Sequence, residues 1–208
     1  VADSLLPRCA PPSLDRVTPN DAQNAAVAAI ERVAHGHARR PLVITADRGR
    51  GKSTVLGVAA SRLLQQGFSR ITVVAPHRGA VSTLFRHARA TLGLGGDGVV
   101  DLAFGSAELR FRLPHELLDA DDQPPGLLLV DEAAAVPVPT LERLLDCSNR
   151  LVFASTLHGY EGSGRGFELR FTRVLQRRMP QWRALRLEPP LRWAVDDPLE
   201  ALVNRALV

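Results

Sequence analysis

One stretch near the start of the chain, residues 41–54 (PLVITADRGRGKST), constrains the fold more than any other. Its apolar run, Leu42–Ala46, predicts a buried parallel strand. A glycine-containing loop follows, and a helical pattern begins at Lys52. A strand, a glycine loop and a helix with Gly-Lys-Ser at the junction form the context that a phosphate-binding loop needs. The loop N–H groups and the helix N-terminus would favour an anion at one point.

Each residue of this loop has an expected role. Lys52 should contact the β- and γ-phosphates of ATP or GTP, and the Ser53 hydroxyl should bind Mg²⁺. The general pattern has glycine where this chain has Ala46, and alanine can hold that position if its φ stays negative. The residues expected around the nucleotide are Ala46, Asp47, Arg48, Gly49, Arg50, Gly51, Lys52, Ser53 and Thr54.

The composition supports this interpretation over a chance Gly-Lys-Ser before a helix. Of the 26 lysine and arginine residues, Lys52 is the only lysine. A compact ammonium fits inside a loop that wraps phosphate, whereas a planar guanidinium does not. The single lysine therefore occupies the position in the predicted phosphate loop where an arginine would not fit.

The length of 208 residues indicates one large domain, which we place at 18–208 after an irregular, Pro-rich lead-in at 1–17. No apolar run approaches membrane-spanning length and no signal pattern is visible, so we expect a cytoplasmic protein with no membrane partner. Cys9 and Cys147 lack metal spacing and are expected to be free thiols. A net charge of +4 permits a nucleic-acid surface but equally fits a solvated, arginine-rich one.

Two segments flanking the loop suggest ligand contacts. Gln23 lies in the first turn of a helix predicted over 22–38, and its amide could read an adenine edge or simply be solvated. A second strand over 71–75 leads into Pro76-His77-Arg78 and a helix over 80–92. This resembles the helicase motif that grips a nucleic-acid backbone, with phosphate contacts from Arg78, Arg86 and Arg89, but an ordinary strand–helix turn is equally consistent.

The second half of a nucleotide site follows later in the chain. The run Leu127–Val130 predicts a buried strand that ends in two carboxylates, Asp131 and Glu132. Buried carboxylates are costly unless they meet a cation. Asp131 is therefore expected to hold Mg²⁺ through water, and Glu132 to orient or deprotonate the attacking water.

The remaining pattern completes an α/β domain of the RecA-like P-loop NTPase type, with a mostly parallel sheet flanked by helices. Two short strands are expected within 99–113, with Arg110 and Arg112 on one side, and a surface connection over 114–126. The strand 150–155 should lie between the P-loop strand, expected to be central, and the carboxylate strand. Other elements are predicted as helices 53–66, 140–147, 167–178 and 197–207 and a strand 184–188.

A glycine-rich segment, 157–167, follows the strand 150–155. Glycine lets the backbone approach a ligand closely, although a passive surface loop would have similar composition. Arg165 precedes the predicted helix and could serve the γ-phosphate as an arginine sensor. A nucleic-acid phosphate is the rival partner for its guanidinium.

Three stretches together resemble the RecD-like helicase module of the tRNA(Met) cytidine acetyltransferases, which make N4-acetylcytidine. They are residues 46–53, residues 155–167 and the pair Pro190–Ala194 with Asp197–Glu200. The resemblance covers roughly residues 18–208, and Ala46 at the first P-loop position fits this family. It implies ATP hydrolysis with Mg²⁺, coupled to acetylation of the wobble cytidine of elongator tRNA(Met).

The resemblance also implies more than this chain contains. Family members carry an acetyltransferase domain with an acetyl-CoA site, and nothing like that domain is visible here. We therefore expect this chain to be the ATPase fragment of a longer protein. Two alternatives remain: a stand-alone superfamily 1 helicase, which normally needs two RecA-like lobes, and a non-hydrolysing nucleotide sensor, against which Glu132 argues.

Overall fold

A computed structural model describes residues 20–95, 101–120, 123–156 and 163–187, with the side chains of 163–168 left out. One sheet with strand order β3-β4-β2-β5-β6-β1-β7 organises the chain. The strands are β1 (Leu42–Ala46), β2 (Arg70–Val74), β3 (Leu102–Phe104), β4 (Ala107–Arg112), β5 (Leu127–Val130), β6 (Leu151–Thr156) and β7 (Arg183–Leu187). Every pairing is parallel except that of β3 with β4, which confirms the predicted α/β class.

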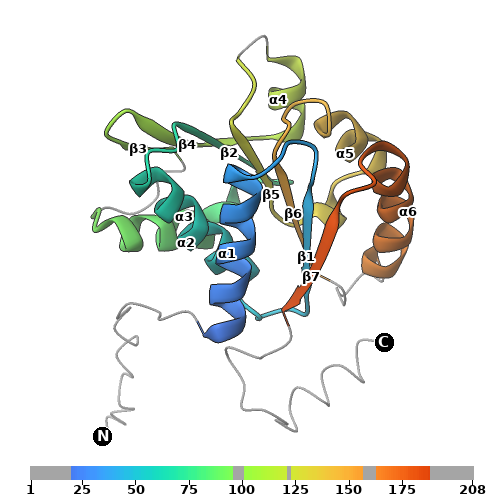
Figure 1. Ribbon diagram of the computed structural model, residues 1–208, viewed down its shortest axis with the longest axis horizontal. Coiled ribbons are helices and arrows are strands. Elements are labelled where there is room, and N and C mark those ends of the chain that lie inside the picture. The colour runs from blue at the N-terminus through green and yellow to red at the C-terminus, as the bar shows by residue number, and fades with distance from the viewer. Residues whose placement is uncertain (1–19, 96–100, 121–122, 157–162, 188–208) are drawn as a thin grey trace, which may run out of the picture.

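Helices cover both faces of the sheet (Figure 1). One face carries α1 (Asp21–His35), α2 (Lys52–Gln65) and α3 (Ser82–Leu92); the other carries α4 (Pro114–Asp119), α5 (Val138–Leu144) and α6 (Ser163–Arg178). No helix in the described ranges is both long and apolar enough to cross a membrane.

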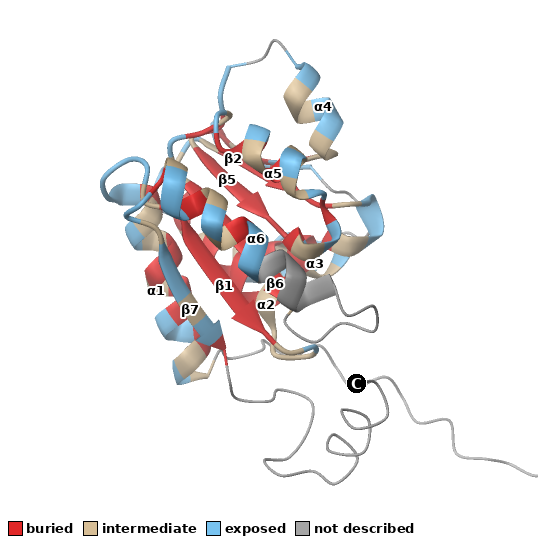
Figure 2. Ribbon diagram, turned by 90° about the vertical axis from the view of Figure 1, so that its right-hand side faces the viewer, coloured by how far each residue is buried: buried red, intermediate tan, exposed pale blue. Residues whose placement is uncertain are grey.

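The central strands are apolar throughout because they are covered on both faces. All side chains of β1 and β5 are buried, whereas β7 at the edge exposes most of its own (Figure 2). Strand β4 alternates instead, with Leu109 and Phe111 buried and Arg110 exposed. Arg110 and Arg112 therefore share one face, as predicted.

The strand order shows how the strands that precede the predicted nucleotide motifs lie relative to one another. Strand β6 lies between β5 and β1, as predicted, and pairs with both in parallel. The expectation that β1 would be central is wrong, because only β7 separates it from the sheet edge. The apolar sequence of β1 is nevertheless explained, because α1 and α2 cover one of its faces and bury its side chains.

Three local predictions need correction. The supposed connection over 114–126 contains α4, where Pro114 starts the helix and Glu116 accepts a 2.8 Å hydrogen bond from the Leu113 N–H. The helix expected over 80–92 is preceded by a 3-10 turn, Arg78–Val81. Helix α6 begins at Ser163 rather than at 167. The predicted helix over 197–207 and the lead-in 1–17 lie outside the described residues.

Helices α2 and α3 approach each other very closely at Gly57. A Cβ atom at this position would overlap the carbonyl oxygen of Leu84 on α3. The Ser61 hydroxyl donates a 2.5 Å hydrogen bond back to the Gly57 carbonyl, so this polar group is satisfied inside the core. Glycine is required here by the contact between two helix backbones.

Candidate nucleotide site

The phosphate loop begins where β1 ends. Ala46, the last residue of β1, is fully buried, and its φ is not in the positive range. The condition under which alanine can replace glycine in this loop is therefore met. Gly49 and Gly51 adopt φ values of 80° and 83°, in the left-handed region that glycine tolerates best.

Helix α2 starts at Lys52, where the helical pattern begins and one residue before the predicted helix 53–66, with Gly51 as its N-cap and no capping side chain. No side chain caps the N-terminal N–H groups of α2, and such uncapped groups favour binding of an anion. Ser53 is partly buried in the first turn, and Thr54 beside it is 7% exposed. Of Lys52, Ser53 and Thr54, the last is therefore the least accessible to a ligand.

The Lys52 ammonium lies back over the loop. Its Nζ donates hydrogen bonds to the carbonyl oxygens of Ala46 (3.2 Å) and Asp47 (3.1 Å). Burial lowers the pKa of Lys52 from 10.5 to about 8, against the opposing attraction of Asp131, Asp47 and Glu132. These carbonyl partners have no sequence signal, since any residue can supply a carbonyl.

Asp131 and Glu132 follow β5 and differ sharply in environment. Asp131 is 1% exposed and its Oδ2 has no hydrogen-bond partner within the described residues, whereas Glu132 is exposed. Burial raises the pKa of Asp131, and the nearby Ser53 hydroxyl and the Glu132 N–H oppose this rise. The geometry therefore brings Ser53, Lys52 and Asp131 together at the carboxyl edge of the sheet.

Glu132 also has an unusual backbone. Its φ of 50° places it in the left-handed region as the N-cap of a 3-10 turn, Ala133–Ala135. Such a conformation is uncommon for a side chain of this size and is often found at functional sites. It turns the chain away from the strand direction directly after Asp131.

Gln23 is held by the N-terminus of α1. Its Oε1 accepts a 3.1 Å hydrogen bond from the Asn20 N–H, while the Asn20 side chain accepts from the Gln23 N–H at 2.8 Å. Gln23 is 1% exposed and its Nε2 has no partner within the described residues. The alternative of a solvated surface glutamine is therefore excluded, and the Nε2 donor is a buried group without a partner among the described residues.

The arginines proposed to contact nucleic acid are placed differently from one another. Arg78 is exposed at the start of its 3-10 turn. Arg86 donates to the Thr83 hydroxyl at 3.5 Å, and Arg89 to the carbonyls of Gly95 and Asp101. Of the three, Arg89 is the one that bonds to the backbone of described residues beyond its own helix.

The glycine-rich segment is only partly described. Ser155 and Thr156 end β6, with Ser155 buried. Residues 157–162 lie outside the described residues. The backbone of Arg165 lies in the first turn of α6 rather than before the helix, and its side chain is outside the described part.

Comparison with known proteins gives consistent results. Residues 43–208 match the family described as RNA cytidine acetyltransferase NAT10/TcmA, helicase domain. The tRNA(Met) cytidine acetyltransferase TmcA of Nitrosococcus halophilus is 49% identical over 199 residues, 95% of this chain and 26% of the relative. That of Vibrio cholerae is 47% identical over 186 residues, 89% of this chain and 26% of the relative.

The chain thus spans about a quarter of the length of these curated relatives. Among solved structures, the large terminase of a thermophilic bacteriophage superposes with a TM-score of 0.54 at 13% identity, covering 81% of this chain and 45% of that one. At that identity the likeness concerns the fold alone.

Proposed function

Since the chain belongs to the helicase-domain family of the NAT10/TcmA RNA cytidine acetyltransferases, we propose that it is the ATP-hydrolysing module of a tRNA(Met) cytidine acetyltransferase. In this proposal ATP hydrolysis is coupled to N4-acetylation of the wobble cytidine of elongator tRNA(Met). Acetyl-CoA and an acetyltransferase domain would then belong to a longer protein of the kind to which the curated relatives, named tRNA(Met) cytidine acetyltransferase TmcA, belong.

One observation carries the ATPase proposal: the buried Asp131 carboxylate lies beside Ser53 and within electrostatic reach of Lys52. A buried carboxylate oxygen without a hydrogen-bond partner is costly unless a ligand satisfies it. The hydroxyl and carboxylate together form the oxygen set that Mg²⁺ prefers. Ser53 and Asp131 would hold Mg²⁺, which supplies charge neutralisation to the β- and γ-phosphates.

The other groups then have separable roles. The loop N–H groups and Lys52 would bind the phosphates, exchanging the Lys52 bonds to the Ala46 and Asp47 carbonyls for phosphate oxygens. Glu132, exposed beside the buried Asp131, would orient the attacking water and take its proton. Arg165, on the helix that follows β6, would stabilise the γ-phosphate in the transition state.

The decisive experiment is single-turnover ATP hydrolysis with and without tRNA, on wild-type protein and on Lys52→Ala. We expect wild-type hydrolysis and its loss in Lys52→Ala, with weakened nucleotide binding. Arg32→Ala, which removes one cation from the exposed surface of α1, is the matched control. Nucleotide binding without hydrolysis would instead indicate a sensor, and strand displacement on a tailed duplex would indicate a stand-alone helicase.

A further inference from the structure

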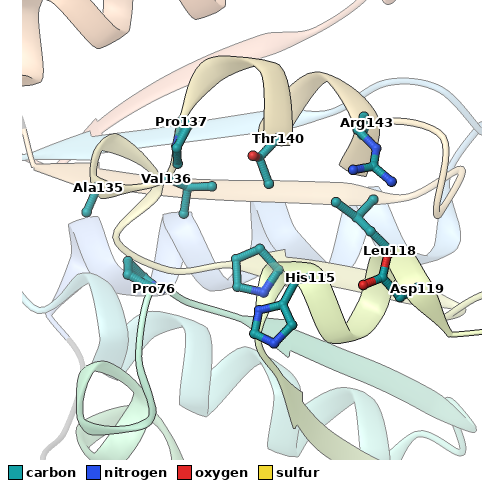
Figure 3. Close-up of a pocket in the computed structure, with 10 residues that line it drawn as sticks. Pro76, His115, Leu118, Asp119, Ala135, Val136, Pro137, Thr140 and Arg143 are labelled. Carbon is teal, nitrogen blue, oxygen red and sulfur yellow. The ribbon is translucent and has the colours of Figure 1, made fainter.

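We propose that a second pocket, next to the nucleotide site, binds one unstacked base of a single-stranded RNA. The inference rests on the proposed function in taking RNA as the substrate. The pocket has a volume of about 380 Å³ and lies between α4, α5, the residue Pro76 after β2 and the segment after Glu132 (Figure 3).

The walls of the pocket suit a flat aromatic ligand. Pro76, Pro114 and Pro137 contribute rigid rings, and His115 of α4 adds an imidazole. Bases stack on aromatic rings such as that of His115 with little sequence preference, and the proline rings add rigid apolar surface beside it. The volume is at the lower end of the range for small-molecule sites, which fits one base better than a folded partner.

Polar groups stand at one end of the pocket. Arg143 of α5 and Asp119 of α4 lie at the same end, away from Pro76 and Ala135 (Figure 3). Neither side chain has an ion-pair or hydrogen-bond partner in the described part of the chain, whereas Arg177 and Arg178 on α6 are paired with Glu142. Arg143 is thus available to the phosphate of the nucleotide whose base is held.

Asp119 gives the pocket a base preference. A carboxylate accepts a hydrogen bond from the exocyclic amino group of cytosine, adenine or guanine, whereas uracil offers only its N3–H, which lies between two carbonyl oxygens that repel a carboxylate. The Thr140 hydroxyl on the pocket wall can donate or accept and so does not discriminate. We therefore expect cytosine to bind more tightly than uracil.

The pocket is connected to the hydrolytic carboxylate through the backbone. Ala135, Val136 and Pro137 line it, and they follow the 3-10 turn that Glu132 caps with φ 50°. A bound base would press on the segment whose conformation sets the direction of Glu132. RNA occupancy is therefore expected to change the rate of ATP turnover.

Fluorescence anisotropy with labelled oligocytidine and oligouridine RNAs of equal length tests the proposal. Arg143→Ala should weaken oligocytidine binding about tenfold and reduce the salt slope by about 0.7. Thr140→Tyr, which fills the pocket, should weaken binding about tenfold and leave the salt slope unchanged. Asp119→Ala should bring the two oligonucleotide affinities together. The control Arg32→Ala lies on the opposite face of the sheet and should change none of these.

Several results would overturn the pocket. An oligocytidine affinity equal to that of the wild type in both Arg143→Ala and Thr140→Tyr would refute the base-binding proposal and leave the ATPase proposal unaffected. An equal loss in Arg32→Ala would show general electrostatic attraction instead. A wild-type protein that hydrolyses ATP but binds neither RNA would also refute the base-binding proposal. If free CMP competes as strongly as oligocytidine, the pocket binds a free nucleotide instead. Thermal unfolding of each variant shows whether it is folded. If Thr140→Tyr fails to fold, Arg143→Ala still tests the proposal, because Arg143 is exposed.

Discussion

The backbone N–H of Glu132 donates a 2.9 Å hydrogen bond to Oδ1 of Asp131. This bond fixes one oxygen of the buried carboxylate and leaves Oδ2 without a partner among the described residues. The two consecutive carboxylates therefore differ in position: that of Asp131 is buried and held, and that of Glu132 is exposed. The division suits one metal ligand and one base, since a base needs access to water and a ligand needs a fixed position.

Glu132→Gln should therefore abolish turnover while preserving ATP affinity. The amide keeps the size of the side chain and the Asp131 hydrogen bond, which comes from the backbone, but cannot accept the proton. We expect single-turnover hydrolysis to fall by about 10²–10⁴-fold, with the affinity for a fluorescent ATP analogue unchanged. Glu31→Gln on α1 is the matched control, and normal hydrolysis by Glu132→Gln would assign the base elsewhere.

Gln23 can be tested by separating its two hydrogen-bonding roles. Gln23→Glu retains an oxygen that accepts the Asn20 N–H but removes the Nε2 donor, whereas Gln23→Ala removes both. If the amide reads adenine, with Oε1 accepting from N6 and Nε2 donating to N7, Gln23→Ala should lose about tenfold or more in ATP affinity relative to GTP, because guanine carries an acceptor in place of the N6 amino group. Calorimetric titration with both nucleotides measures this, and an unchanged ATP-to-GTP ratio would leave Gln23 as a helix cap.

Nucleotide binding should depend on pH through Lys52. With a pKa near 8 in the free protein, the side chain loses its proton above that pH. Phosphate charges would raise this pKa, so binding should take up a proton and weaken as the pH rises above about 8. Calorimetry in buffers of different ionisation enthalpy measures the uptake, and Lys52→Met should abolish it.

The same group affects unfolding with the opposite sign. Between its folded pKa of about 8 and the ordinary value of 10.5, the unfolded chain holds the Lys52 proton and the folded chain does not. The free energy of unfolding of the free protein should therefore gain a contribution from Lys52 as the pH rises through this window. Comparing the pH dependence of thermal unfolding in wild type and Lys52→Met isolates that contribution.

Arg165 has two candidate partners with different signatures. If it serves the γ-phosphate, Arg165→Ala should reduce hydrolysis by about 10³-fold, as loss of an arginine finger does, and leave RNA affinity unchanged. If it serves RNA, affinity and salt slope should fall instead. Arg173→Ala, exposed further along α6, controls for the loss of charge. We expect the first outcome.

Gly57→Ala should destabilise the fold although alanine normally favours helices over glycine. The added Cβ would overlap the Leu84 carbonyl, and neither helix backbone can yield locally. We expect a loss of about 1–3 kcal/mol in the free energy of unfolding, measured by denaturant titration. Gly95→Ala, where a Cβ meets nothing within 4 Å, should change it by less than about 0.5 kcal/mol.

The elements that could be predicted are those in which local pattern and burial agree. The strands β1 and β5 were predictable because an apolar run covered on both faces needs no alternation, and α2 because Gly51 precedes a long helical pattern. Helix α4 was missed because an acidic, Pro-rich composition concealed a proline start and the Glu116 cap. The pocket with Arg143 had no sequence signal, because its walls come from elements far apart in the chain.

The contact at Gly57 joins two parts of the molecule that ligands would reach separately. Helix α2 carries Lys52 and Ser53 at its start, and α3 follows directly on the exposed turn that holds Arg78. Since the two backbones meet without an intervening side chain, we expect α2 and α3 to move together. A shift of the phosphate loop on nucleotide binding or release would therefore displace the basic turn by a similar amount, without any bond between them.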